Sequence, residues 1–276
     1  MRYTISMLEF EILTRGLYRR DQLAITYDSS LTMPLTPAIE AWIERVWREK
    51  LQLSREQNFR LYDAPLFRLV EVQARDDGTL HVVLGDTSYK EYMATREPEF
   101  AQEHSREELG NALAVCSVVE TTDGYILYER RQRTAIHGGR FHVIAGFFDR
   151  TYDTDASGQP DPFAAMCREL REETGIQAQD IQEQYCLGAV YDTAHPHGEL
   201  CFFTQLKISL AEVRTRVPED DEIQHLLALH VTSESLRDFV VTNHGNISST
   251  GEPNLLMYGA MRFGENWFAG VMQNIA

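Results

Sequence analysis

The residues of this chain best suited to chemistry are three glutamates, Glu169, Glu172 and Glu173, in the segment RELREETGI at 168–176. In a helix, Glu169 and Glu173 are one turn apart and Glu172 lies beside them, so their charges repel each other unless a cation bridges them. Carboxylate ligands without paired histidine or cysteine favour Mg²⁺ or Mn²⁺ over Zn²⁺. The segment therefore predicts a divalent-metal site, in which Arg168 ion-pairs with one glutamate and holds its rotamer.

The helix that carries these glutamates is predicted from its two ends. Asp161 is placed to cap the N-terminus and Pro162 suits the first helical position, while Gly175 can close the C-terminus in the left-handed conformation. The apolar face of this helix comprises Phe163, Met166, Cys167 and Leu170. The glutamates lie roughly 120° away from it, so we expect the apolar face to anchor the helix and the acidic face to reach outward. The alternative is an amphipathic helix whose charged face is only solvated.

Composition limits the classes of protein to which the chain can belong. Its 276 residues are 43% hydrophobic, enough for one large domain or two smaller ones, and its formal net charge is -16. That charge disfavours nucleic acid and anionic membranes as main partners, and a phosphate substrate would need a metal and local arginines. No stretch of about 18 apolar residues occurs, and the N-terminal segment does not resemble a signal peptide, so we expect a cytoplasmic protein. Buried, reduced thiols are expected for the four cysteines, Cys116, Cys167, Cys186 and Cys201.

The first 107 residues predict a small α+β module. Thr36 and Pro37 mark the start of a helix with apolar residues at helical spacing. A hairpin should follow at 66–84, with its turn at 76–78, and Thr87 is placed to cap a short helix. The polar, acidic segment 97–111 is the best candidate for a linker, so the domain boundary is expected near residue 108.

Residues 108–276 predict a second unit, an α/β/α sandwich with a mixed sheet. Its helices are expected at 162–174, 234–239 and 253–263. Its strands are expected at 114–119, 125–128, 141–144, 185–191, 200–206 and 223–231.

The order of these parts resembles the Nudix hydrolase family over residues 110–240. The sequence REL-x-EE-x-GI at 168–176 is similar to the core of the Nudix box, and a strand leading to Gly146 precedes it. The resemblance implies a hydrolase that cleaves a nucleoside diphosphate linked to another group with the help of bound divalent ions. It implies that Glu169, Glu172 and Glu173 bind metal or position water, that Arg168 orients them, and that the main chain near Gly146 adds a carbonyl ligand.

The sequence departs from the family's box in its first half. Gly146 precedes Arg168 by 22 positions, about eight more than in the family. Counting from either end places no glutamate where the box has its first one, so Asp149 is the nearest acidic substitute, ahead of Asp153 and Asp155. The alternative is that these aspartates only decorate a polar loop.

Hydrolysis also needs a general base, which takes the proton from water. Glu172 is the first candidate. Glu222 is the second, because many Nudix enzymes carry an acid in the corresponding late loop; the alternative for Glu222 is a solvated loop residue.

Three further residues are predicted to bind the substrate. Arg130 and Arg131 end a strand that in this family borders the cleft, and a guanidinium suits bidentate contact with phosphate. Alternation along that strand predicts that only one of the two points inward. Tyr191 lies with His195 and His197 in a predicted loop, where an aromatic ring can stack on a base or sugar. Surface positions are the favoured alternative for both histidines.

A second resemblance narrows the substrate. Residues 66–69 and 84–92 look like the N-terminal module of the UDP-glucose and UDP-galactose hydrolysing branch of the family, which also has a stretched box. It implies conversion of a UDP-sugar and water to UMP and sugar 1-phosphate. An ADP-ribose or other dinucleotide pyrophosphatase, and a Nudix-like sensor that binds without cleaving, are the alternatives. The module could cover the cleft, contact the base or form a homodimer interface, and composition does not choose among these.

Overall fold

The computed structural model describes residues 8–131, 138–220, 223 and 225–275. Over these residues the chain forms a large mixed sheet with strand order β1-β9-β10-β5-β6-β11, in which β8 also pairs with β5 and β7 with β6. Its strands are β1 (Phe10–Tyr18), β5 (Leu113–Glu120), β6 (Tyr125–Arg130), β7 (Phe141–His142), β8 (Ile144–Phe147), β9 (Ile181–Asp192), β10 (His197–Leu206) and β11 (Leu226–His230). Within this large sheet, β10 and β5 pair in parallel, and the other described pairs are antiparallel.

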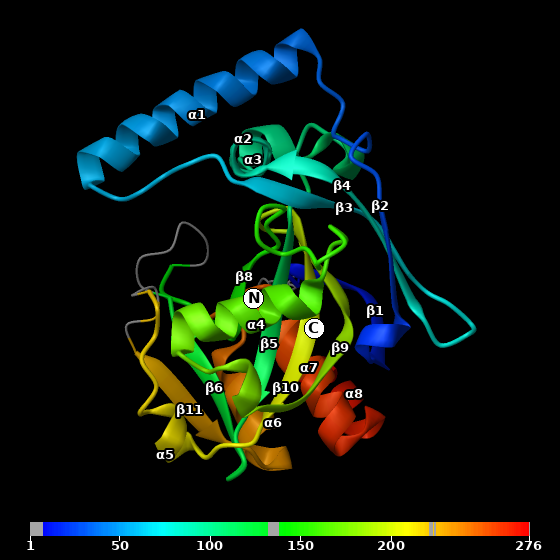
Figure 1. Ribbon diagram of the computed structural model, residues 1–276, viewed down its shortest axis with the longest axis vertical. Helices are drawn as coiled ribbons and strands as arrows, with labels where there is room; N and C mark the ends of the chain where they lie inside the picture. The colour runs from blue at the N-terminus through cyan, green and yellow to red at the C-terminus, as the bar shows by residue number, and fades with distance from the viewer. Residues whose placement is uncertain (1–7, 132–137, 221–222, 224, 276) are drawn as a thin grey trace, which may run out of the picture.

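Helices cover both faces of this sheet (Figure 1), which confirms the predicted α/β/α sandwich. The helix α4 (Pro162–Thr174) packs on one face, where Phe163, Met166 and Leu170 join a core built around β5 and β10. The opposite face is covered by α6 (Ser233–Asn243), α7 (Gly251–Phe263) and α8 (Glu265–Ile275). A further short helix, α5 (Leu210–Val213), follows β10. The two cores fix the direction in which α4 points its remaining side chains.

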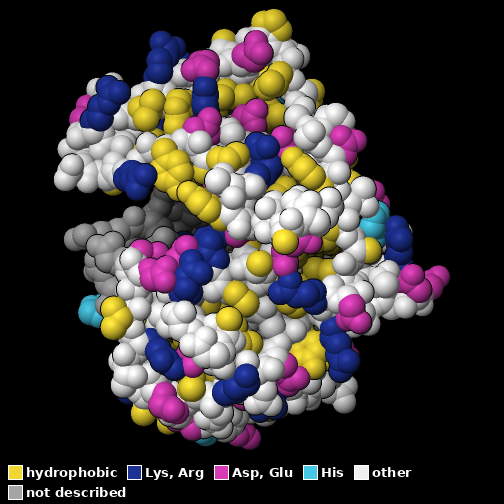
Figure 2. Space-filling model, viewed as in Figure 1, with side chains coloured by type: hydrophobic (Ala, Val, Ile, Leu, Met, Phe, Trp, Pro, Cys, Tyr) yellow, Lys and Arg dark blue, Asp and Glu magenta, His cyan; other side chains and the backbone are white. Residues whose placement is uncertain are grey.

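A smaller sheet with order β2-β4-β3 forms the centre of the N-terminal module, by which we mean β2 to β4 with α1 to α3. Its elements are β2 (Leu23–Tyr27), α1 (Pro37–Gln57), β3 (Pro65–Ala74), β4 (Leu80–Ser88), α2 (Tyr89–Thr95) and α3 (Pro98–Ala101). Thr36 caps α1 as predicted. The apolar face of α1 packs on α2 and α3, where the Trp42 indole donates a hydrogen bond to the carbonyl of Ala94, 2.9 Å away. The face shown in Figure 2 is hollowed on one side, between this module and the rest of the molecule.

Several sequence predictions need correction. Ser88, not Thr87, caps α2, because its side chain accepts a hydrogen bond from the amide of Glu91. The segment predicted as a linker contains α3, and its residues Phe100 and Leu109 are buried in the core of the module. The strand predicted at 141–144 is two short strands that pair with different neighbours, since β7 lies on β6 and β8 on β5.

Other elements were not predicted at all. The strand β1 precedes the expected boundary yet joins the large sheet beside β9, and β2 and α8 also lacked a sequence prediction. All four cysteines are free thiols, as predicted. Cys116, Cys186 and Cys201 are buried, but Cys167 is only partly buried, so the predicted burial is wrong for this residue. Among the helices of the described residues, none combines the length and the apolar composition that a membrane crossing requires.

Candidate functional site

The helix α4 begins and ends where the sequence predicts. The Asp161 carboxylate accepts hydrogen bonds from the amides of Phe163 and Ala164, both at 3.1 Å, and Pro162 occupies the first helical position. Gly175 ends the helix with φ of 73°, a conformation that suits a residue without a Cβ. These local signals fix where α4 begins and ends, while the apolar residues packed in the core fix the face on which its glutamates lie.

The glutamates of α4 do not all reach outward as predicted. Glu169 and Glu173 are 8% and 4% exposed, because the helix face that carries them packs against β8. The Glu172 side chain is 29% exposed. Two carboxylates are therefore held in a low-dielectric environment, where a charge needs a partner.

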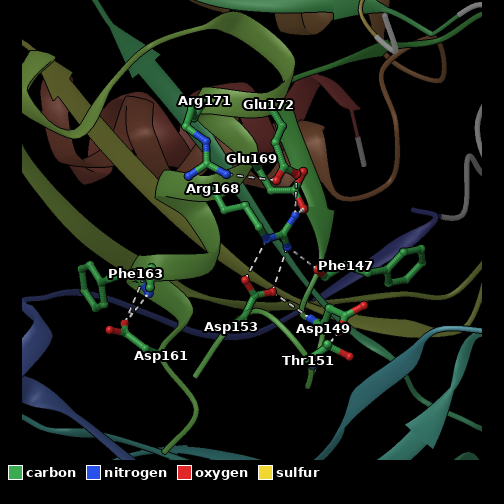
Figure 3. Close-up of polar contacts among 11 residues, drawn as sticks. Phe147, Asp149, Thr151, Asp153, Asp161, Phe163, Arg168, Glu169, Arg171 and Glu172 are labelled. Atoms are coloured by element: carbon green, nitrogen blue, oxygen red, sulfur yellow. Dashed lines mark hydrogen bonds and ion pairs between the residues drawn. The ribbon is translucent and has the colours of Figure 1, made fainter. Parts of the chain in front are cut away.

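Arg168 is the residue around which this site is organised (Figure 3). Its Nη1 lies 2.8 Å from Oε1 of Glu169 and 2.9 Å from Oε2 of Glu172. Its Nη2 donates to the main-chain carbonyl of Phe147 at 3.1 Å. Burial alone would lower the pKa of Arg168, but hydrogen bonds to Asp153 and the charge of Glu169 outweigh burial and raise that pKa. The guanidinium thus stays a cation and forms ion pairs with two glutamates of α4.

The acidic partner of Arg168 in the loop before the helix is Asp153. Asp149, which the sequence analysis placed first as a substitute for the first glutamate of the box, has a different set of partners. Nε and Nη2 of Arg168 each lie 2.8 Å from a different oxygen of Asp153, whose side chain is 1% exposed. Asp149 instead accepts a hydrogen bond from the amide of Thr151 at 2.6 Å. Its own amide donates to Asp153 at 2.8 Å. Asp149 therefore shapes the loop, and Asp153 completes the ion pair.

The inserted residues explain how a stretched box keeps this geometry. In the segment 154–160, the amide of Asp155 donates to the carbonyl of Gln159 at 2.8 Å, and Gly158 turns the chain with φ of 80°. The segment closes on itself, so the amide of Asp161 donates to the carbonyl of Asp153 at 2.9 Å. Asp153 and the N-cap of α4 are thus adjacent in space. No spacing rule in the sequence gives this result, because it depends on closure of the turn.

Gly146 lies directly against Glu169. A Cβ built on Gly146 would be 1.9 Å from Oε1 of Glu169, so only glycine allows this carboxylate to rest on the main chain of β8. Gly146 pairs with Val115 in β5, which holds that main chain in place. The close approach places the carboxylate of Glu169 directly on the main chain of β8.

This donor set fits a hard divalent cation. Every candidate ligand, from Glu169, Glu172, Glu173 and the main chain at Gly146, is an oxygen atom. Among the described residues, no three acidic, histidine or cysteine side chains already converge at metal-binding distance. Glu169 and Glu172 are turned toward Arg168, so a bound cation requires these two carboxylates to share their charge between Arg168 and the metal.

The segment 217–220 is attached to the end of α4. The amides of Glu219 and Asp220 donate to the carbonyl of Glu172, at 2.9 and 3.1 Å. Nε of Arg171 lies 3.0 Å from a Glu219 oxygen. Glu222, the second candidate for the general base, lies outside the described residues.

The two arginines predicted to bind phosphate differ in their surroundings. The side chain of Arg130 is exposed, and its Nε donates to the carbonyl of Gly139 at 3.0 Å. The side chain of Arg131 is only 14% exposed, and its Nε lies 3.5 Å from an oxygen of Glu129.

Tyr191 and His197 lie in strands β9 and β10, not in the predicted loop. The Tyr191 hydroxyl donates to Asn111 at 2.6 Å, and burial raises its pKa. His197 is 4% exposed, so the predicted surface position is wrong for it, and its Nε2 lies 3.4 Å from Oε2 of Glu199. His195 is partly exposed in the turn between the strands.

Comparison with known proteins gives a family for part of the chain. The family model described as the NUDIX domain matches residues 110–245. The matched part runs from the start of β5 to the end of α6 and includes Gly146, the inserted turn and α4. No curated protein matches the chain.

Solved structures similar to this chain include three from bacteria. The protein DR0079 from Deinococcus radiodurans is 15% identical, covers 53% of this chain and 83% of its own, and has a TM-score of 0.38. The Bacillus subtilis pyrophosphohydrolase BsRppH is 13% identical, with coverage of 56% and 83% and a TM-score of 0.36. A bifunctional NMN adenylyltransferase/ADP ribose pyrophosphatase from Francisella tularensis, complexed with AMP and a Mn ion, is 13% identical, with coverage of 55% and 41% and a TM-score of 0.37.

Proposed function

We propose that residues 110–245, which match the NUDIX domain model, form a Nudix pyrophosphohydrolase domain, and that this protein uses Mg²⁺ or Mn²⁺ to cleave the pyrophosphate of a UDP-sugar. The observation that carries the catalytic part of the proposal is the arrangement on α4. Arg168 holds Glu169 and Glu172 from one side while Asp153 fixes the guanidinium from the other. Such fixed carboxylates are what a divalent cation needs for a defined position.

The metal would be held by Glu169, Glu173 and Glu172 together with the main chain near Gly146. When bound, a divalent cation neutralises the charge of the pyrophosphate and makes water more acidic. The protein's own residues hold the carboxylates in fixed positions and accept a proton. Glu172 is our first candidate for the general base, since it is the most exposed of the three and can meet a water molecule.

The reaction conserves all atoms of the substrate and one water. Water adds to one phosphorus of the pyrophosphate, the bond from that phosphorus to the bridging oxygen breaks, and the products are UMP and sugar 1-phosphate. The proton of the attacking water passes to the base. Attack at either phosphorus gives the same two products, but the oxygen from water then resides in a different one.

The UDP-sugar part of the proposal rests on the resemblance of residues 66–69 and 84–92 to the corresponding branch of the family. These segments lie next to the box. The ring of Tyr89 packs edge-on against Phe147, the residue after Gly146, with centroids 5.7 Å apart. This proximity supports a role for the N-terminal module in substrate selection.

A substrate panel tests the proposal. The purified protein is incubated with UDP-glucose, UDP-galactose, ADP-ribose and NADH, with Mg²⁺, with Mn²⁺ or with EDTA, and nucleoside monophosphate is measured. We expect UMP and sugar 1-phosphate from the UDP-sugars only when metal is present. Turnover of ADP-ribose alone would overturn the UDP-sugar proposal. Metal-dependent binding without product, unchanged by Glu172→Gln, would show a sensor instead of an enzyme.

Labelled water then identifies the reacting phosphorus. With ¹⁸O-water, the label in UMP shows attack at the phosphorus next to uridine, and the label in sugar 1-phosphate shows attack at the other.

A further inference from the structure

The loop that joins β8 to α4, residues 148–161, is attached to the N-terminal module by its main chain. We call it the box loop. The amide of Phe67 donates to the carbonyl of Phe148 at 3.0 Å, and the amide of Arg150 donates to the carbonyl of Pro65 at 2.9 Å. The start of β3 therefore pairs with the box loop almost as a neighbouring strand would.

One side chain of the box loop, Arg150, extends this attachment. Its Nη1 lies 2.7 Å from Oδ2 of Asp86. Its Nε donates to the carbonyl of Leu66 at 3.1 Å, and its Nη2 lies 3.5 Å from the carbonyl of Thr87. A planar guanidinium has donors in a fixed fork, so three acceptors around it define its position far better than a single ion pair does.

All three strands of the small sheet take part in holding Arg150. Leu66 is in β3, and Asp86 and Thr87 are in β4. From β2, the Tyr27 hydroxyl donates to Oδ1 of Asp86 at 2.6 Å and fixes the carboxylate from its other side. Both partners of the ion pair are mostly buried, since Arg150 and Asp86 have side-chain exposures of 28% and 22%. A pair of this kind is screened less by solvent than an exposed one.

The box loop also contacts the helix α4. The amide of Asp149, next to Arg150, donates to Asp153 at 2.8 Å, and Asp153 receives both nitrogens of Arg168. Described hydrogen bonds and ion pairs thus run without a break from Tyr27 to the glutamates of α4. Each non-covalent contact in this series is 3.1 Å or shorter, and one step is the peptide bond between Asp149 and Arg150.

From this arrangement we propose that Arg150 is a positioning residue, through which the N-terminal module holds the box loop so that Asp153 meets Arg168. This inference rests on the proposed function, because it assigns Arg150 to the metal-binding and hydrolytic site of α4. Arg150 touches neither substrate nor metal in this account. It acts through Asp153 and Arg168, and it makes the N-terminal module part of the catalytic apparatus.

The test compares Arg150→Ala, Arg150→Lys and Asp86→Asn in the full chain. Lys50→Met is the matched control, since Lys50 forms a 2.7 Å ion pair with Glu97 at similar exposure, 30% for each side chain, within the same module. Three quantities are measured: Mn²⁺ affinity by electron paramagnetic resonance, kcat and KM on the substrate that the panel identifies, and hydrogen exchange of the amides of residues 148–153. Thermal unfolding reports whether each variant is folded.

For Arg150→Ala we expect faster hydrogen exchange in the box loop and Mn²⁺ binding or kcat reduced about 10- to 100-fold, the range typical of lost partners of metal ligands. Arg150→Lys keeps the positive charge beside Asp86 but loses the planar set of guanidinium donors. Its reduction of Mn²⁺ binding or kcat should therefore be smaller than that of Arg150→Ala. Asp86→Asn should resemble Arg150→Lys, and Lys50→Met should match the wild type. If Arg150→Ala does not fold, Arg150→Lys and Asp86→Asn decide the question by the same measurements.

Two outcomes separate failure of this inference from failure of the proposed function. Normal Mn²⁺ affinity, normal kcat and unchanged hydrogen exchange in folded Arg150 variants would overturn the role of Arg150 while leaving the enzyme intact. A wild-type protein that neither binds Mn²⁺ nor hydrolyses any substrate would refute the proposed function, and with it the catalytic consequence assigned to Arg150. In that case, hydrogen exchange would still show whether Arg150 holds the loop.

Discussion

Asp153 of the box loop faces Arg168 of α4 so that two guanidinium nitrogens each lie 2.8 Å from a separate carboxylate oxygen. The pair is bidentate and largely shielded from water, which gives it a fixed geometry as well as a favourable energy. Arg168 in turn holds Glu169 and Glu172, so the position of these carboxylates depends on an aspartate in a different segment of the chain.

We therefore expect Asp153→Asn to lower kcat about 10- to 100-fold with little change in side-chain volume, because an amide cannot accept from both nitrogens and leaves Arg168 free to turn. Steady-state kinetics on the panel substrate measures the effect. Asp155→Asn is the control, since Asp155 lies in the same loop but bonds only within the inserted turn. Equal kcat values for the two variants would show that Asp153 has no special role in the site.

Glu169→Gln and Glu173→Gln should each weaken Mn²⁺ binding at least tenfold, because each removes a negative charge from the buried face of α4. Isothermal titration calorimetry or paramagnetic resonance measures the affinity without requiring turnover. Glu234→Gln, at an exposed position in the first turn of α6, is the control and should bind normally. Unaltered affinity in both α4 variants would place the metal elsewhere.

Gly146→Ala should separate activity from stability. The added Cβ would meet Oε1 of Glu169 at 1.9 Å, and the end of a glutamate side chain can move aside, so the fold should survive with Glu169 displaced. We expect a Tm close to that of the wild type and a loss of metal affinity similar to that of Glu169→Gln. Gly270→Ala is the control, because a Cβ at Gly270 meets no other atom within 4 Å. A fully active Gly146→Ala protein would contradict the close approach.

The stability of the protein should depend on pH through His197. Burial alone would lower the pKa of His197, but the carboxylates of Glu199 and Asp192 outweigh burial and raise that pKa above its usual value. When the pKa of a group is higher in the folded state than in the unfolded state, its protonation stabilises the folded protein. This stabilisation is complete below the unfolded-state pKa, about 6.5 for histidine, and is lost as pH rises through the folded-state pKa. The buried charge pair is therefore most favourable in acid.

Urea unfolding of the wild type and His197→Gln, measured from pH 5.5 to pH 8.5, checks this sign. We expect the difference in free energy of unfolding to favour the wild type at the acid end and to shrink as pH rises. A difference that stayed constant over this range would show that His197 has the same pKa in the folded and unfolded states. A difference that grew with pH would show that burial, and not the carboxylates, sets its pKa.

Local signals in the sequence were enough to predict the helix α4. Asp161, Pro162 and Gly175 act on the backbone within one turn of their own position. The ends of α4 can therefore be predicted without knowing which distant residues pack on it. The hairpin of β3 and β4 is equally local, since its turn at 76–78 contains a glycine with φ of 82°. The family resemblance then added the expectation that the glutamates serve in pyrophosphate cleavage. Their spacing alone predicts only a metal site.

The features that escaped prediction depend on distant parts of the chain. Burial of Glu169 and Glu173 follows from the packing of α4 on β8, and periodicity places these residues on a polar face without showing what covers it. The choice of Asp153 over Asp149 follows from closure of the inserted turn, which a count of positions cannot reveal. Among the described strands, β1 pairs with β9 alone, so its own sequence carries little evidence of the sheet that it joins.

That last pairing has a consequence for how the protein is made. Phe10 leaves the ribosome early, but its partner Asp192 follows roughly 180 residues later, so the edge of the large sheet is completed only when most of the chain has been synthesised. Until then β1 must wait without its ladder of hydrogen bonds. A chain that begins at residue 108 would never receive β1, and its β9 would present an open edge to other molecules, which makes that fragment prone to aggregation.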